Sequence, residues 1–239
     1  HVKTTLIQAL TGIDTDRLPE EKARGLSIDL GYAYSELSDG SLVGFVDVPG
    51  HARFIGNMLA GVAGIDAGLL VVAVDDGPMP QTLEHLAILD LLGVNQGVVA
   101  LTKTDRAPPE RIAEVMAETQ ALLAPTSLSG AQIIETAALA GIGITELDQA
   151  LQSLEPSESR DEGAFRLAVD RVFTLRGVGL IATGTVFSGR LKVGDELLIS
   201  PAGLPVAARG LHAQNRPAET AGTGTRCAIN MVGRHAGEK

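Results

Sequence analysis

The chain shows two successive patterns of apolar and polar positions. Up to about residue 155, runs of consecutive apolar residues alternate with segments in which apolar residues recur every three or four positions. Such runs are typical of strands buried on both faces, and the longer period is typical of helices that pack on a sheet. This part is therefore predicted to be an α/β domain, a mostly parallel sheet with helices on both faces. The expected strands are 41–48, 68–74, 97–101 and 133–138, and the expected helices are 6–10, 54–60, 81–92, 109–123 and 144–154, the last with Thr145 as its N-cap.

A polar stretch at 155–163 reads as a linker, and the pattern changes after it. Short strand-like runs follow, separated by glycine-containing turns, and no helical period is found among them. This pattern predicts a small β-barrel. We expect two domains, 1–160 and 161–239. The expected strands of the second are 165–173, 179–187, 196–200 and 206–211.

Composition narrows the possible functions. The net charge of -10 and the pI of about 4.9 argue against a protein that coats nucleic acid electrostatically. Aromatic residues make up 3% of the chain, which disfavours base-stacking platforms. No apolar run reaches 18 residues, so no membrane span is expected. The single cysteine, Cys227, excludes an internal disulfide and fits a reducing, cytoplasmic location.

The run from Asp47 to His51 follows an expected strand and precedes an expected helix. At the carboxyl edge of a parallel sheet, a carboxylate such as Asp47 can hold Mg²⁺ through water. The backbone N–H of Gly50 can reach a terminal phosphate, and His51 then faces the group that attacks it. Taken alone, the run also fits an ordinary turn at the end of a strand.

A second candidate motif, Thr102-Lys103-Thr104-Asp105, follows another buried strand. The carboxylate of Asp105 can accept two hydrogen bonds from guanine, a donor pair that adenine does not offer, and the stem of Lys103 can lie along the base. The motif is weak as a lone tetrapeptide.

Lys3, Thr4 and Thr5 stand before an expected helix and match the tail of the phosphate-binding motif G-x-x-x-x-G-K-[ST]. In that motif the lysine offsets phosphate charge, the hydroxyl of the next residue binds Mg²⁺, and N–H groups at the helix start cradle phosphate. The chain departs from the motif because it opens His1-Val2-Lys3, without a glycine.

In order and spacing, these elements resemble the translational GTPase family, whose phosphate loop reads GHVDHGKT. His1-Val2 and Lys3-Thr4 match four of its positions. We expect that three residues between Val2 and Lys3 are missing because they are unresolved. The alternative is a deletion, which would abolish phosphate binding.

The resemblance implies further site residues. Ser27 stands where the family has a threonine that binds Mg²⁺ and senses the γ-phosphate. Thr102 replaces the usual asparagine. Ala137-Ala138-Leu139 replaces Ser-Ala-Leu, the element that gives a backbone N–H to the guanine oxygen. The implied activity is GTP hydrolysis to GDP, dependent on Mg²⁺ and stimulated by the ribosome, with His51 orienting the water.

Within this family, residues 11–33, 51–92 and 169–173 resemble selenocysteine-specific elongation factors. The implied partners are selenocysteyl-tRNA, the ribosome and an mRNA element. Binding the mRNA element should need further domains that do not fit in this chain, so the chain is expected to be a fragment.

Three residues of the second domain give a physical reason for selenocysteine. Where elongation factor Tu has Glu-Asp and an asparagine, this chain has Asp170-Arg171 and Arg226. Selenocysteine is anionic at neutral pH, whereas serine is neutral. A pocket with two arginines would favour the anion, and Asp170 would orient the arginines or meet the α-amino group. Surface charges on a barrel rim are the alternative.

Two other functions remain open. The chain could belong to another carrier of aminoacyl-tRNA, such as elongation factor Tu or the initiation factor. If the phosphate loop is truly deleted, it could be a nucleotide-binding module that does not hydrolyse GTP.

Overall fold

The computed structural model describes residues 2–15, 30–37, 40–49, 64–155 and 163–233. The chain divides into two compact units. Among the described residues, those of 2–49 and 65–155 belong to the first unit, and Gly64 and 163–233 belong to the second. None of the described helices is long and apolar enough to cross a membrane.

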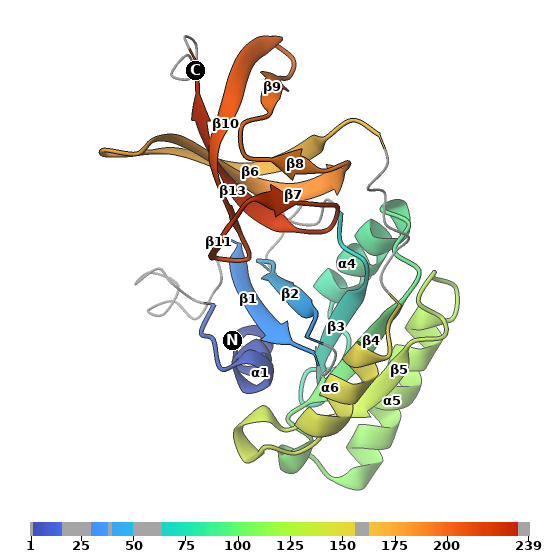
Figure 1. Ribbon diagram of the computed structural model, residues 1–239. Helices are drawn as coiled ribbons and strands as arrows, with labels where there is room; N and C mark the ends of the chain where they lie inside the picture. The colour runs from blue at the N-terminus through green and yellow to red at the C-terminus, as the bar shows by residue number, and fades with distance from the viewer. Residues whose placement is uncertain (1, 16–29, 38–39, 50–63, 156–162, 234–239) are drawn as a thin grey trace. The chain divides into compact units, whose positions relative to one another are not determined.

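The sheet of the first unit is parallel, as predicted (Figure 1). Strands β3 (Gly68–Ala73), β4 (Gly97–Thr102) and β5 (Gln132–Glu135) lie in the order β3-β4-β5. Two more strands, β1 (Gly31–Glu36) and β2 (Leu42–Asp47), form an antiparallel pair. Only the second strand of this pair was expected from the sequence, because the start of β1 carries no long apolar run.

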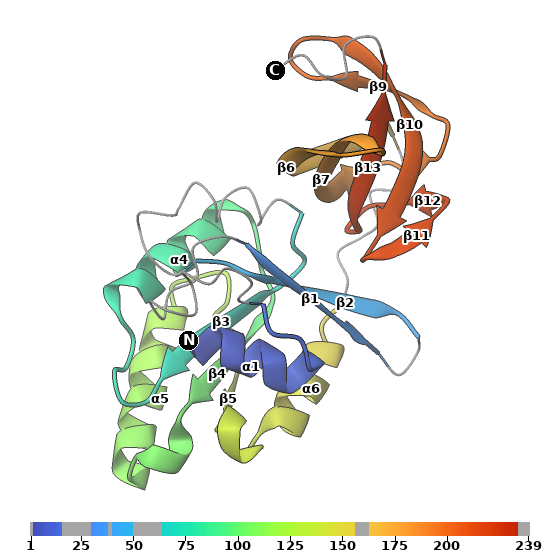
Figure 2. The same ribbon diagram turned by 90° about the vertical axis from the view of Figure 1, so that its left-hand side faces the viewer.

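Helices cover both faces of the parallel sheet, which confirms the α/β prediction (Figure 2). Helices α1 (Val2–Thr11) and α6 (Ile144–Gln152) bury apolar side chains with Val98 and Ala100 of β4. Helices α4 (Pro80–Leu91) and α5 (Pro109–Leu123) pack on the opposite face. Alternate residues of one strand therefore enter two separate cores.

Two boundaries differ from the prediction. β5 ends at Glu135, and Ala138–Ala140 form a short 3-10 helix, η3. The N-cap of α6 is Gly143 instead of Thr145, because the φ of Gly143 is 70° and its carbonyl accepts the first helical bond, from Leu147. The expected helix 54–60 lies outside the described residues.

The second unit is an antiparallel β structure, and the predicted absence of helix holds for 163–233. Its main sheet has the strand order β11-β10-β13-β7-β6, with β9 paired to β10, and β8 pairs separately with β12. Strand β13, in which alternate residues are buried, was not among the expected strands. The described pairs do not close into a ring, so a closed barrel stays a prediction. The strands are β6 (Arg166–Leu175), β7 (Gly179–Ser188), β8 (Leu191–Lys192), β9 (Glu196–Ile199), β10 (Leu204–Ala213), β11 (Arg216–Ala218), β12 (Thr220–Ala221) and β13 (Arg226–Val232).

The start of the parallel sheet depends on a glycine contact. Gly97 lies opposite Gly68, and a Cβ on Gly97 would stand 2.3 Å from the Gly68 carbonyl oxygen. We expect Gly97→Ala to lower the free energy of unfolding of the first unit by about 2–4 kcal/mol, because β3 and β4 would have to separate. Urea unfolding measures this. Gly130→Ala is the matched control, since a Cβ there meets nothing within 4 Å, and equal losses in both variants would contradict the prediction.

Candidate functional site

The buried carboxylate of Asp47, at the end of β2, joins two segments of the first unit. Asp47 is 3% exposed, and its Oδ2 accepts hydrogen bonds from Oγ1 of Thr4 (3.0 Å) and Oγ1 of Thr15 (2.8 Å). Thr4 lies in the first turn of α1, which Thr5 continues. A hydroxyl and a carboxylate in contact are hard oxygen ligands of the kind that Mg²⁺ prefers.

Sequence reasoning missed Thr15. It is 4% exposed and lies just beyond α1 in a polar stretch, without a motif to mark it. Gly31, which pairs with Asp47 in the β1–β2 register, makes the approach of Thr15 possible. A Cβ on Gly31 would stand 2.6 Å from Cβ of Thr15 and 3.3 Å from Cβ of Asp47. The sequence gives no local signal for this contact, because the pairing of Gly31 with Asp47 is defined only by the folded strands.

Lys3 lies beside this carboxylate. Its Nζ donates to the Val48 carbonyl over 2.6 Å. Burial lowers the pKa of Lys3, and the opposite charge of Asp47 counteracts part of that effect. The Lys3 ammonium and the Thr4 hydroxyl thus both contact the chain at the end of β2.

The full sequence has Val2 and Lys3 as neighbours, so the expected unresolved residues between them are not part of this chain. The two are consecutive residues of α1, which runs unbroken from Val2 to Thr11. The residue before the lysine is therefore a valine, where the motif has a glycine. The residues predicted to bind the base and the metal are present in the sequence, whereas a glycine before the lysine is not.

The loop after β4 carries the candidate guanine-binding residues. Thr102 is buried, and its hydroxyl donates to the Val72 carbonyl (3.2 Å). Lys103 is left-handed, with φ of 63°, and its Nζ lies 2.5 Å from Oδ2 of Asp75. This hydrogen bond lowers the pKa of Asp75. Asp105 follows in a 3-10 turn, η2 (Thr104–Arg106), with its side chain 33% exposed.

The loop after β5 lies next to the guanine-loop motif. Both the backbone N–H and the hydroxyl of Thr104 donate to the Thr136 carbonyl, over 3.3 and 3.2 Å. The N–H of Ala137 already bonds the Ile142 carbonyl (3.0 Å). Ala138 and Leu139 begin η3, and the first N–H groups of a helix have no acceptor within it. A base carbonyl could therefore reach Ala138 or Leu139, but not Ala137.

Ser27, Gly50 and His51 lie outside the described residues, so their expected places at the phosphate end stay predictions.

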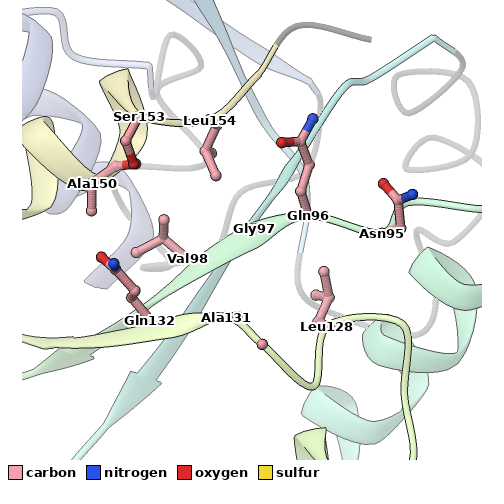
Figure 3. Close-up of a pocket in the computed structure, with 11 residues that line it drawn as sticks. Asn95, Gln96, Gly97, Val98, Leu128, Ala131, Gln132, Ala150, Ser153 and Leu154 are labelled. Atoms are coloured by element: carbon pink, nitrogen blue, oxygen red, sulfur yellow. The ribbon is translucent and has the colours of Figure 1, made fainter.

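A pocket of about 250 Å³ lies at the opposite, amino-terminal edge of the parallel sheet (Figure 3). Its lining includes Gln96 and Gly97 before and at the start of β4, Ala131 before β5, and Ser153 and Leu154 after α6. The pocket shares no residue with the candidate nucleotide site.

In the second unit, three polar side chains form one cluster. Arg226 donates from Nε to Oδ2 of Asp170 (3.1 Å) and from Nη2 to Oδ1 (3.0 Å). The hydroxyl of Thr183 donates to the same Oδ1 (2.5 Å). The side chains of Arg226 and Asp170 are 17% and 5% exposed. Arg171 follows Asp170 and lies opposite Thr183 in the β6–β7 register.

This fold and these residues agree with the comparison to known families. Residues 2–157 match the family model of the elongation factor Tu GTP binding domain. The chain belongs to this family of GTP-binding domains.

The most informative relatives are selenocysteine-specific elongation factors. The chain is 52% identical over 233 residues to that of Escherichia coli (strain K12), covering 98% of this chain and 38% of the relative. It is 47% identical over 240 residues to that of Desulfomicrobium baculatum, covering 100% of this chain and 38% of the relative. The chain thus spans 38% of the length of each of these curated relatives.

Solved structures agree. A bacterial selenocysteine-specific elongation factor, EF-Sec, superposes with a TM-score of 0.90 at 37% identity, over 96% of this chain and 40% of that one. The elongation factor SelB from Methanococcus maripaludis, in complex with the GTP analogue GPPNHP, superposes with a TM-score of 0.84 at 31% identity. This match covers 97% of this chain and 49% of that one.

The partly buried ammonium of Lys3 predicts an effect on stability. Lys3→Met should raise the free energy of unfolding of the nucleotide-free chain by about 1 kcal/mol near neutral pH. The reason is that the hydrogen bond to the Val48 carbonyl does not replace the hydration that the Lys3 ammonium loses on burial. Between the lowered pKa of Lys3 and 10.5, the unfolded state binds more protons than the folded state, so wild-type stability rises with pH there. The difference in free energy of unfolding between Lys3→Met and the wild type should therefore become smaller as pH rises.

Urea unfolding across a pH series measures both effects. Lys103→Met is the control, since that ammonium pairs with Asp75 at the surface and its removal should not stabilise the chain. A lower stability of Lys3→Met at every pH would show that the ammonium is well compensated.

Proposed function

We propose that this chain is the GTP-binding part of a selenocysteine-specific elongation factor. Such a factor binds GTP, delivers selenocysteyl-tRNA to the ribosome and hydrolyses GTP to GDP and phosphate, and we place this activity in the cytoplasm. The observation that supports the proposal most strongly is the 52% identity to such a factor over 98% of the chain. We assign residues 1–160 to the GTP-binding domain and 161–239 to a β-barrel that contacts the aminoacyl group.

The metal part of the site suits Mg²⁺. Thr4 and Asp47 are in contact, and we assign Ser27 as a third oxygen ligand. Among the described residues, no group of three or more His, Cys, Asp and Glu side chains could hold a metal by itself. Magnesium would therefore take its remaining ligands from water and phosphate, as it commonly does.

The base and phosphate parts follow the same logic. Asp105 would accept the two guanine donors, with Lys103 along the base, Thr102 holding the loop to β3 and the Ala137–Leu139 turn donating a backbone N–H. At the other end, Lys3, Thr5 and the backbone of Gly50 would face phosphate, and His51 would orient water. The mRNA element would be bound by parts of the protein beyond this chain.

The cluster in the second unit supports selection of an anion. Asp170 balances the charge of Arg226, so one excess positive charge remains among the three side chains Asp170, Arg171 and Arg226. A selenolate gains from that charge and from the fixed donors of a guanidinium, whereas a neutral serine hydroxyl gains little.

We expect Arg171→Ala to reduce the preference for selenocysteyl-tRNA over seryl-tRNA by about tenfold, because the excess charge is lost. Binding of both tRNAs in the presence of GTP and Mg²⁺ measures the ratio. Arg166→Ala is the matched control, an exposed arginine at the start of the same strand. An unchanged ratio in Arg171→Ala would refute anion selection at this site.

One observation favours a second candidate function. Val2 directly precedes Lys3 within α1, so the chain has no glycine to turn the backbone around phosphate. A module that recognises guanine weakly and does not hydrolyse GTP would fit that arrangement.

Insertion of Asp-His-Gly between Val2 and Lys3 separates the two candidates. If the second is right, the insertion should tighten binding of fluorescent GDP by about a thousandfold or more, because it restores several N–H donors to phosphate. An insertion of three alanines at the same place is the control. Submicromolar GDP binding by the unaltered chain would instead support the first candidate.

A further inference from the structure

We propose that Thr183 is a positioning residue of the aminoacyl pocket: its hydroxyl fixes the Asp170 carboxylate, which in turn holds the guanidinium of Arg226. The inference rests on the proposed function, since the pocket is the one assigned there to the selenocysteine side chain. It assigns a role to a neutral residue on β7 that belongs to no motif.

A β-bulge brings Asp170 into the cluster. Along β6, Val169 pairs with Gly184 and Arg171 pairs with Thr183, so Asp170 is the extra residue of the bulge. A bulge of this kind re-aims side chains and is common beside functional sites. Gly184 permits it, because a Cβ there would stand 2.1 Å from the Ala168 carbonyl oxygen and 3.0 Å from Cα of Val169. Thr183 and Gly184 thus act together, one binding the bulged carboxylate and the other making room for it.

The cluster lies on the face of the sheet that is turned away from the core of the second unit. On β7, Ala182 and Val186 enter that core, so Thr183 and Thr185 project from the other face. On β13, Cys227 enters the core, and Arg226 lies opposite Thr185. The neighbouring strands β6, β7 and β13 therefore each contribute to one polar surface (Figure 1).

Burial makes each donor to this carboxylate important. Thr183 is 7% exposed and the Asp170 side chain is 5% exposed, so water cannot readily replace a lost hydroxyl. The Thr183 hydroxyl and two N–H groups of Arg226 all donate to Asp170. Without the hydroxyl, one carboxylate oxygen loses a short hydrogen bond, and the fork between Asp170 and Arg226 is free to rotate. A guanidinium that is not held in one orientation offers an anion fewer aligned donors.

Exchange of the Arg226 Nε–H with solvent, followed by NMR and assigned with Arg226→Lys, tests this on the chain itself. Thr183→Val should speed the exchange by about tenfold, because the bidentate contact opens more often. Thr183→Ser keeps the hydroxyl, so the Arg226 Nε–H should exchange slowly in that variant. Thr185→Val is the matched control, since it lies on the same face of β7 and its side chain makes no hydrogen bond to Asp170 within the described structure. Unchanged exchange in Thr183→Val, or equal acceleration in Thr185→Val, would overturn the proposal.

The tRNA preference provides a second readout. Thr183→Val should reduce the ratio of selenocysteyl-tRNA to seryl-tRNA affinity several-fold, and Thr183→Ser should restore it. If Arg171→Ala and Arg226→Ala leave the ratio unchanged, the proposed function fails. If they abolish the preference while Thr183→Val preserves it, only the role of Thr183 fails. Thermal unfolding of each variant confirms that it is folded. Where tRNA binding is too weak to quantify, the exchange measurement decides whether Thr183 has the proposed role.

Discussion

The nucleotide end of this molecule depends on one buried carboxylate, that of Asp47. A carboxylate in the interior is tolerated only when donors surround it. Here hydroxyls from two segments, Thr4 in α1 and Thr15 beyond it, bind the same oxygen. The ammonium of Lys3 bonds the carbonyl of the next residue along. These contacts thus fix where the first helix meets the end of β2, and they bring hydroxyl, carboxylate and ammonium together. Preorganisation of this kind is what a phosphate and metal site requires.

Asp170 in the second unit also accepts a hydrogen bond from a threonine, but a charged guanidinium donates to it as well. The two hydroxyls that donate to Asp47 Oδ2 are neutral, and the positive charge near Asp47 is that of the Lys3 ammonium. Asp170 is paired with the guanidinium of Arg226, so its charge is neutralised. It contributes a fixed orientation of the arginine instead. The two buried carboxylates thus differ in their donors, which are hydroxyls for Asp47 and a hydroxyl with a guanidinium for Asp170.

Sequence alone predicted the elements whose signal is an unbroken apolar run or a helical period. β3, β4 and α5 were expected at nearly their observed bounds. Both strands supply side chains to two cores, and α5 packs in one of them. Contacts made by short polar side chains could not be predicted. Thr15 and Thr183 lie far along the chain from the carboxylates they bind, and no local pattern links them. The bulge at Asp170 was equally invisible, since it depends on the missing Cβ of Gly184 and on a register that only the folded sheet defines.

Membership of the family and affinity for phosphate depend on different residues. The match spans residues 2–157, which include the residues that we propose for the base and the metal. Phosphate affinity depends on a few N–H groups that precede the lysine, and there the chain has Val2 within α1. The helix start, the ammonium of Lys3 and the hydroxyl of Thr4 still offer attraction to an anion. A β-branched residue in helical conformation, however, cannot supply the left-handed turn that glycine allows. The loss of that turn would remove the phosphate cradle while leaving the sheet, both cores and the guanine loop intact, because none of them depends on it.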